Sequence, residues 1–113
     1  MAKKIFPLPG CTVDFAFQRI GGKYKGRILW YLHGHMILRY GELRRTVEGI
    51  TAKMLTQTLR ELEEDQLIIK TTFHEARPHV EYSLTDSGKQ LIPFIIHLNS
   101  WGQQRMAQLE TTT

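Results

Sequence analysis

Five residues between positions 52 and 60 share one face of a helical pattern, and four of them carry polar side chains that suit bases and phosphates. They are Ala52, Lys53, Thr56, Gln57 and Arg60. Arg and Lys side chains pair with O6 and N7 of guanine, and Gln pairs with N6 and N7 of adenine. A threonine hydroxyl can serve a base or a phosphate. The pattern predicts a helix that contacts DNA, although a solvated helix face is the simpler alternative.

The opposite face of this helix is expected to be buried. Its members recur at intervals of three and four residues, and they are Met54, Leu55, Thr58, Leu59 and Leu62. Thr51 is the expected N-cap and a further DNA-contact candidate. Four acids follow near the end of the helix, namely Glu61, Glu63, Glu64 and Asp65. Because DNA would repel these acids, only the first half of the helix should approach a duplex.

Three arginines precede this helix, at Arg39, Arg44 and Arg45. A short helix is expected around the last two, and V-E-G-I-T separates it from the long one, which makes residues 39–67 a helix-turn-helix candidate. The first helix of this motif crosses the DNA backbone. We therefore expect the three arginines to contact phosphates rather than to be ordinary surface charge.

The elements before this unit must position it. Residues 1–11 hold two prolines and Gly10, and they are expected to form an irregular arm. A helix is predicted over residues 12–22, where the pair Gly21-Gly22 stops it. A second helix is predicted from Lys23 to His33, with Gly34 at its end. Residues 36–38 form an apolar connector that suits a strand stub.

The periodicity changes after Leu67. Residues 68–73 and 80–84 favour strands, and H-E-A-R-P-H between them carries Arg77, so residues 68–84 are expected to form a β-hairpin with a charged tip. Thr85 should cap a final helix over residues 86–110. The apolar residues of this helix exceed one amphipathic stripe, and they are Leu91, Ile92, Phe94, Ile95, Ile96, Leu98 and Trp101. That surplus predicts burial against a second subunit.

Composition fits one domain with a nucleic-acid partner. The chain has 113 residues and a formal charge of +4, with its basic residues concentrated in 1–27 and 39–60. A single cysteine suits a reducing compartment, no apolar run is long enough to span a membrane, and the first residues lack the apolar core of a secretory signal. We therefore expect a cytoplasmic protein with no membrane partner.

Cys11 and two histidines are the remaining candidates for chemistry. Cys11 is either a half-buried packing residue or a thiolate sensor, since it is expected just before a helix whose amides would favour the thiolate. Any disulfide would join two molecules or a small thiol. His33 and His35 lack a third ligand nearby, so a helix end explains them better than a metal site. Trp30, Tyr31, Tyr40 and Trp101 are expected in the core or at an interface.

Four motifs together resemble the HxlR family of bacterial transcriptional regulators. They are I-G-G-K-Y at 20–24, Y-G-E-L-R-R at 40–45, G-I-T-A-K-M-L-T-Q-T-L-R-E-L-E at 49–63 and R-P-H-V-E-Y-S-L-T-D-S-G at 77–88. The similarity runs from about Cys11 to Gly102. It departs from the family pattern at Tyr24, where a tryptophan is usual, at Thr12 after the cysteine, and at the wing tip.

The resemblance implies a mainly α winged helix-turn-helix domain with a β-hairpin wing. It also implies a homodimer joined through residues 12–22 and 86–110, the Thr51 helix in the major groove of a palindromic operator, and the wing near the minor groove. Some family members sense oxidants, quinones or aldehydes at the position of Cys11, so an oxidant or small molecule is an expected inducer.

The sequence predicts neither an enzyme nor a cofactor. It contains no glycine-rich phosphate loop, no nucleophile elbow and no paired carboxylates outside the acidic helix end. A dimeric DNA-binding regulator is the favoured hypothesis. The alternatives are a winged-helix dimerisation or adaptor module without specific DNA binding, and a small enzyme whose polar pocket is not evident.

Overall fold

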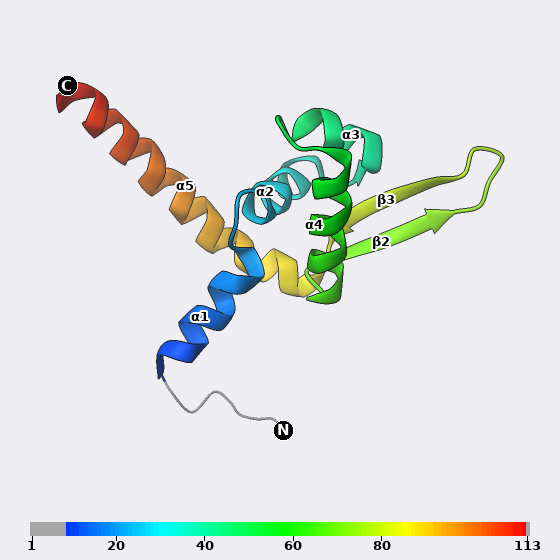
Figure 1. Ribbon diagram of the computed structural model, residues 1–113, viewed down its shortest axis with the longest axis horizontal. Helices are drawn as coiled ribbons and strands as arrows, with labels where there is room; N and C mark the ends of the chain where they lie inside the picture. Colours follow the sequence, from blue (N-terminus) through cyan, green and yellow to red (C-terminus); the bar gives the residue numbers. More distant parts are fainter. Residues whose placement is uncertain (1–8, 113) are drawn as a thin grey trace.

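The computed structural model describes residues 9–112, which form five helices and a small antiparallel sheet whose hairpin projects away from the helices (Figure 1). The helices are α1 (Pro9–Ile20), α2 (Lys25–His35), α3 (Tyr40–Thr46), α4 (Ala52–Glu64) and α5 (Asp86–Thr112). The strands are β1 (Leu38–Arg39), β2 (Ile68–Phe73) and β3 (His79–Leu84). The predicted winged helix-turn-helix is confirmed, with α3 and α4 as its two helices and β2–β3 as its wing.

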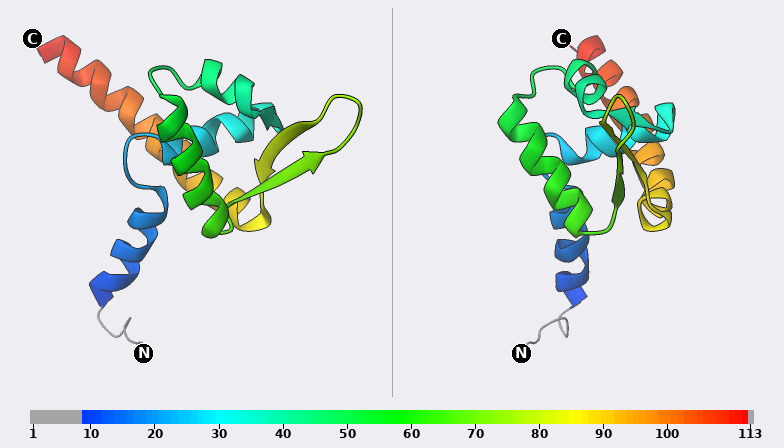
Figure 2. Two further views of the ribbon diagram at one scale, coloured as in Figure 1. Left: turned by 45° about the vertical axis from the view of Figure 1, so that its right-hand side comes forward. Right: turned by 90° about the vertical axis from the view of Figure 1, so that its right-hand side faces the viewer.

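The sheet places the wing beside the helix-turn-helix. Its strand order is β1-β3-β2, and Leu38 pairs with Tyr82 while Ile68 pairs with Leu84. Of the strand stub predicted at residues 36–38, only Leu38 lies in a strand, because β1 is Leu38–Arg39 and forms an edge of the sheet beside β3. Figure 2 shows the two long strands extending away from the helices to an exposed tip.

The core lies where α2, α3, α4 and the start of α5 meet the sheet. Its largest fully buried side chains are Ile28, Leu29 and Leu32 of α2, Leu43 of α3, Val47 just after α3, and Leu55 and Leu62 of α4. From α5, Ile92 and Ile95 are also buried. This common core fixes α4 relative to the wing, because every helix that positions α4 buries its stripe against the same cluster.

The first helix begins earlier than the sequence predicts. Pro9, Gly10 and Cys11 belong to α1, so the irregular arm expected over residues 1–11 is wrong for those three, and the rest of that arm lies outside the described residues. Proline suits the first helical position because its φ is already helical and its missing N–H needs no partner there. The predicted stop holds, since α1 ends at Ile20 and Gly22 takes a φ of +84°.

The end of α2 also differs from the prediction. Gly34 lies inside the helix, and Met36 takes the positive φ of 69° that a glycine was expected to supply. The Met36 N–H donates to the Leu32 carbonyl at 2.9 Å, and the Ile37 N–H donates to the His35 carbonyl at 2.7 Å. These two hydrogen bonds form a capped end followed by a γ-turn, so the chain reverses two residues later than Gly34 suggested.

The start of α5 is fastened to the segment that leaves α4. Thr85 Oγ1 donates to the Gln66 carbonyl at 2.6 Å, and the Thr85 N–H donates to the Leu67 carbonyl at 3.1 Å. The Gly88 N–H donates to Thr85 Oγ1 at 2.9 Å, which confirms the predicted cap. A Cβ on Gly88 would lie 2.2 Å from the Leu67 carbonyl oxygen, so the backbones approach this closely only because residue 88 is glycine.

Candidate nucleic-acid interface

The buried face of α4 follows the predicted stripe with one exception. Leu55, Thr58, Leu59 and Leu62 are buried, but the Met54 side chain is 42% exposed, so its predicted burial is wrong. Met54 lies at the edge of the stripe and lines a groove between α4 and the segment that joins α1 to α2. The Thr58 hydroxyl donates to the Met54 carbonyl at 2.7 Å, which satisfies this hydroxyl inside an apolar core.

Thr51 starts α4 as the sequence predicts. Its Oγ1 accepts the Met54 N–H at 3.1 Å, and its backbone is extended, as an N-cap residue requires. The cap uses this hydroxyl as an acceptor and leaves its own proton available. Thr51 therefore remains in place for a phosphate contact at the first turn of α4, which stays a prediction.

The outward face of α4 gathers the polar side chains that the sequence singles out. Ala52, Lys53, Thr56, Gln57 and Arg60 are all exposed, and they line one surface hollow together with Glu61 and Glu64. Within residues 9–112, neither Lys53 nor Arg60 has a carboxylate within ion-pair distance. Both cations are thus available to an anionic ligand.

Tyr40, at the start of α3, supports this face. Its hydroxyl donates to the Ala52 carbonyl at 3.2 Å and lies 3.0 Å from Thr56 Oγ1. Because the hydroxyl has one proton, the Thr56 hydroxyl is the donor of the second bond when the first is formed. The ring packs against the core as predicted, whereas the contact with Thr56 was not predicted.

The arginines before α4 are exposed at two places. Arg44 and Arg45 lie in the last turn of α3, and Arg39 lies at its start in β1. The Arg39 backbone N–H donates to Glu42 Oε1 at 2.8 Å, so this part of Arg39 caps α3 while its guanidinium stays exposed. The structure therefore carries all three guanidinium groups on elements next to the start of α4, which is where the motif would meet phosphates.

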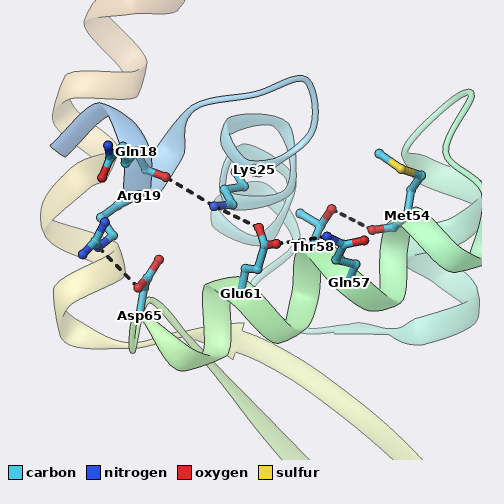
Figure 3. A network of polar contacts seen from close by, with 8 residues as sticks. All are labelled: Gln18, Arg19, Lys25, Met54, Gln57, Thr58, Glu61 and Asp65. Atoms are coloured by element: carbon cyan, nitrogen blue, oxygen red, sulfur yellow. Dashed lines mark hydrogen bonds and ion pairs between the residues drawn. The ribbon is translucent and has the colours of Figure 1, made fainter. Parts of the chain in front are cut away.

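The acidic end of α4 is partly neutralised by cations from earlier helices (Figure 3). Lys25 Nζ lies 3.1 Å from Glu61 Oε1 and donates to the Gln18 carbonyl at 3.3 Å, while Arg19 Nε lies 3.3 Å from Asp65 Oδ1. The hydrogen bond from Lys25 holds the pKa of Glu61 below its ordinary value, and a hydrogen bond from Gln57 and the Lys25 charge act in the same direction. Sequence reasoning missed these pairs.

The wing presents Arg77 at its tip. Phe73 and His79 stack with ring centroids 4.8 Å apart, and His79 Nδ1 lies 3.0 Å from the Arg77 carbonyl oxygen. His79 Nε2 is 3.1 Å from Glu81 Oε2. The backbone beside the tip is therefore held by His79, while the Arg77 side chain is exposed and has no ion-pair partner in the described part of the chain.

Cys11 lies in the first turn of α1 rather than before it, and it is half-buried. Figure 1 shows the start of α1 well away from α3 and the wing, so the structure does not bring Cys11 to the DNA-contact candidates. Among residues 9–112, no group of three or more His, Cys, Asp or Glu could hold a metal ion. No helix in that range is long and apolar enough to cross a membrane.

Comparison with known proteins gives one consistent family. The protein family described as HxlR-like helix-turn-helix matches residues 19–110 of this chain. The uncharacterized HTH-type transcriptional regulator YybR of Bacillus subtilis is 43% identical, over 96% of this chain and 87% of that protein.

Two solved structures of redox-related regulators are also similar. The redox regulator HypR in its reduced form is 38% identical, with a TM-score of 0.82 over 88% of this chain and 98% of that one. The reduced form of the transcriptional regulator YodB from B. subtilis is 27% identical, with a TM-score of 0.74 over 89% of this chain and 94% of that one.

Proposed function

This chain belongs to the HxlR-like helix-turn-helix family, and on that premise we propose that it regulates transcription by binding a palindromic operator as a homodimer. Its family and relatives are transcriptional regulators, not enzymes. The outward face of α4 carries the proposal. Lys53, Thr56 and Gln57 stand exposed on a helix of the size that fits a major groove.

The proposed division of labour follows from side-chain chemistry and position. Lys53, Thr56 and Gln57 read base edges from the first half of α4, and Arg60 contacts a phosphate because it lies further along the helix. Arg39, Arg44, Arg45 and Thr51 position the domain on the backbone, and Arg77 brings the wing to the adjacent minor groove. Phosphate contacts would make the affinity strongly dependent on salt.

The surfaces of α1 and α5 support the proposed dimer. Both helices extend away from the core in Figures 1 and 2, and α5 has a length of roughly 40 Å at 1.5 Å per residue. They expose a series of large apolar side chains, namely Val13, Phe15, Phe17, Phe94, Ile96, Leu98, Trp101, Met106 and Leu109. An exposed apolar surface of this extent favours a subunit interface, and a second copy of the chain offers the same surface.

We also propose that Cys11 senses oxidants or electrophiles. The names of the similar structures, HypR as a redox regulator and YodB in a reduced form, support this, as does the place of Cys11 on a proposed dimer helix. With a quinone, the thiolate sulfur would bond to a ring carbon and the ring would take up a proton. The adduct would add bulk near the subunit junction and change how the two α4 helices are spaced.

Binding to the DNA just upstream of the gene for this protein tests the proposed function. We expect a discrete shifted complex with that duplex, at a concentration where a scrambled duplex of equal length and composition stays unbound. The variant Lys53→Ala/Gln57→Ala should bind both duplexes equally weakly. Equal binding of both duplexes by the unaltered protein would instead favour the dimerisation or adaptor module without specific DNA binding.

A further inference from the structure

The side chain of Gln57 is held by a chain of polar contacts that begins in α1. Gln57 Nε2 donates to Glu61 Oε2 at 3.3 Å, and Lys25 Nζ lies 3.1 Å from Glu61 Oε1. The same ammonium donates to the Gln18 carbonyl at 3.3 Å. In Figure 3 these side chains form a continuous line from α1 to the outward face of α4. Each oxygen of Glu61 therefore has its own donor.

This arrangement fixes which way the Gln57 amide points. A carboxylate accepts hydrogen bonds and donates none, so it favours the amide orientation that turns Nε2 toward Glu61 and Oε1 away. The amide nitrogen keeps a second N–H after this bond. Adenine needs one acceptor and one donor from glutamine, at N6 and N7, and the fixed amide offers both.

The charge of Lys25 allows the Glu61 carboxylate to lie near DNA. A bare carboxylate near the duplex would repel phosphates, but the Lys25 ammonium lies against Glu61 and offsets its charge. The Lys25 side chain is only 17% exposed, whereas that of Glu61 is 41% exposed. The largely buried Lys25 side chain thus lies between α1 and α4, where it binds the more exposed Glu61 carboxylate.

We propose that Glu61 and Lys25 are positioning residues that make Gln57 select adenine. This inference rests on the proposed function, because it assigns the origin of base preference within that function. Without Glu61 the Gln57 amide can turn over, and its NH2 group can then donate to the O6 and N7 acceptors of guanine. Preference at one base pair of each half-site should therefore relax from A·T toward G·C.

Selection from a random-sequence duplex library tests this. The unaltered protein should select a palindrome, and Gln57→Ala should identify the base pair that Gln57 reads. At that pair, Glu61→Ala should reduce the preference for A·T over G·C by about fivefold or more, out of the roughly 5- to 150-fold that a bidentate contact supplies. Lys25→Met should reduce it less, because Gln57 and Glu61 can still pair.

Glu64→Ala is the matched control, since Glu64 is an exposed acid on the same helix and forms no hydrogen bond or ion pair with Gln57, Glu61 or Lys25 among the described residues. Both acid-to-alanine variants should bind all DNA somewhat more tightly, but Glu64→Ala should keep the base preference. Unchanged preference in Glu61→Ala, equal relaxation in Glu64→Ala, or no base pair that depends on Gln57 would each overturn the inference. Failure of the unaltered protein to select any sequence would refute the proposed function itself.

Discussion

The Phe17 ring of α1 meets the Phe94 ring of α5 edge to face, with centroids 6.4 Å apart and planes inclined at 74°. The two terminal helices are thus joined within one chain by an aromatic contact whose two rings both stay accessible, since Phe17 is 55% exposed and Phe94 is 40% exposed. This pair joins the apolar surfaces of α1 and α5 into one surface, which a second subunit can cover as a unit.

The first prediction concerns that surface. Sedimentation equilibrium at low micromolar concentration should give twice the chain mass of 13.2 kDa. Trp101→Glu should give the single chain mass, because its indole is 60% exposed on α5 and a buried charge in its place opposes association. Ile69→Glu is the control, since Ile69 is a comparably exposed apolar residue of β2. A monomer in the unaltered protein would remove the model of two half-sites.

Tyr40→Phe should loosen the start of α4. The variant removes the hydroxyl that bonds to Ala52 and Thr56, and we expect a loss of about 0.5–1.5 kcal/mol per hydrogen bond in the free energy of unfolding by urea. Tyr31→Phe removes a partly buried hydroxyl that has no hydrogen-bond partner among the described residues, and it should cost less. Equal stability of Tyr40→Phe and the unaltered protein would show that these bonds contribute nothing.

Gln57→Ala and Arg44→Ala should both lower DNA affinity, but with different dependence on DNA sequence and on salt. Loss of a base contact should cost roughly 1–3 kcal/mol on the operator and little on a scrambled duplex. Loss of a phosphate contact should weaken both duplexes alike and reduce the slope of log affinity against log salt by about one. Affinities across a salt series measure both quantities. Equal losses on both duplexes for Gln57→Ala would contradict its reading role.

Arg77→Ala should weaken binding most where the flanking DNA is rich in A·T. Such tracts have a narrow minor groove whose negative potential attracts an inserted arginine. Affinities for operators with A·T and G·C flanks give the comparison. Lys70→Ala, an exposed cation on β2 away from the tip, should affect the two flanks equally. If Arg77→Ala leaves both affinities unchanged, the wing has only a structural role.

Treatment with diamide or benzoquinone should lower operator affinity by about tenfold or more, equivalent to roughly 1.4 kcal/mol. Diamide would oxidise two Cys11 thiols to one intermolecular disulfide and would itself be reduced to the hydrazine. Cys11→Ser should bind the operator normally and resist both reagents, because Cys11 is the only cysteine in these 113 residues. The same loss of affinity in Cys11→Ser would assign the effect to other side chains.

Local signals in the sequence predicted most of the fold. The Thr51 and Thr85 caps, the stop at Gly21-Gly22 and the hairpin depend on residues a few positions apart, so a pattern can identify them. Pro9 and Met36 were missed because a helix end depends on which backbone hydrogen bonds the fold completes. Gly34 suggested an end that the Met36 cap places two residues later.

The outward face of α4 was predicted correctly because helical periodicity alone sets it. The contacts that hold the side chains of this face in place were not predicted. Lys25 and Glu61 are far apart in the sequence, and their contact arises only after α2 and α4 have packed on the same core. Tyr40 and Thr56 meet for the same reason. Periodicity identifies which side chains face outward, whereas the contacts that orient them depend on tertiary packing.

The close approach at Gly88 couples the orientation of α4 to that of α5. Because the first turn of α5 is held against Gln66 and Leu67, no flexible hinge lies between α4 and α5, and the tilt of α5 sets the tilt of α4. Because α5 is about 40 Å long, a displacement of roughly 3.5 Å at its far end corresponds to a rotation of only about 5° at its first turn. A small shift of the α5 tip therefore turns α4 by only a few degrees, and a large, sustained shift of that tip is needed to turn α4 appreciably.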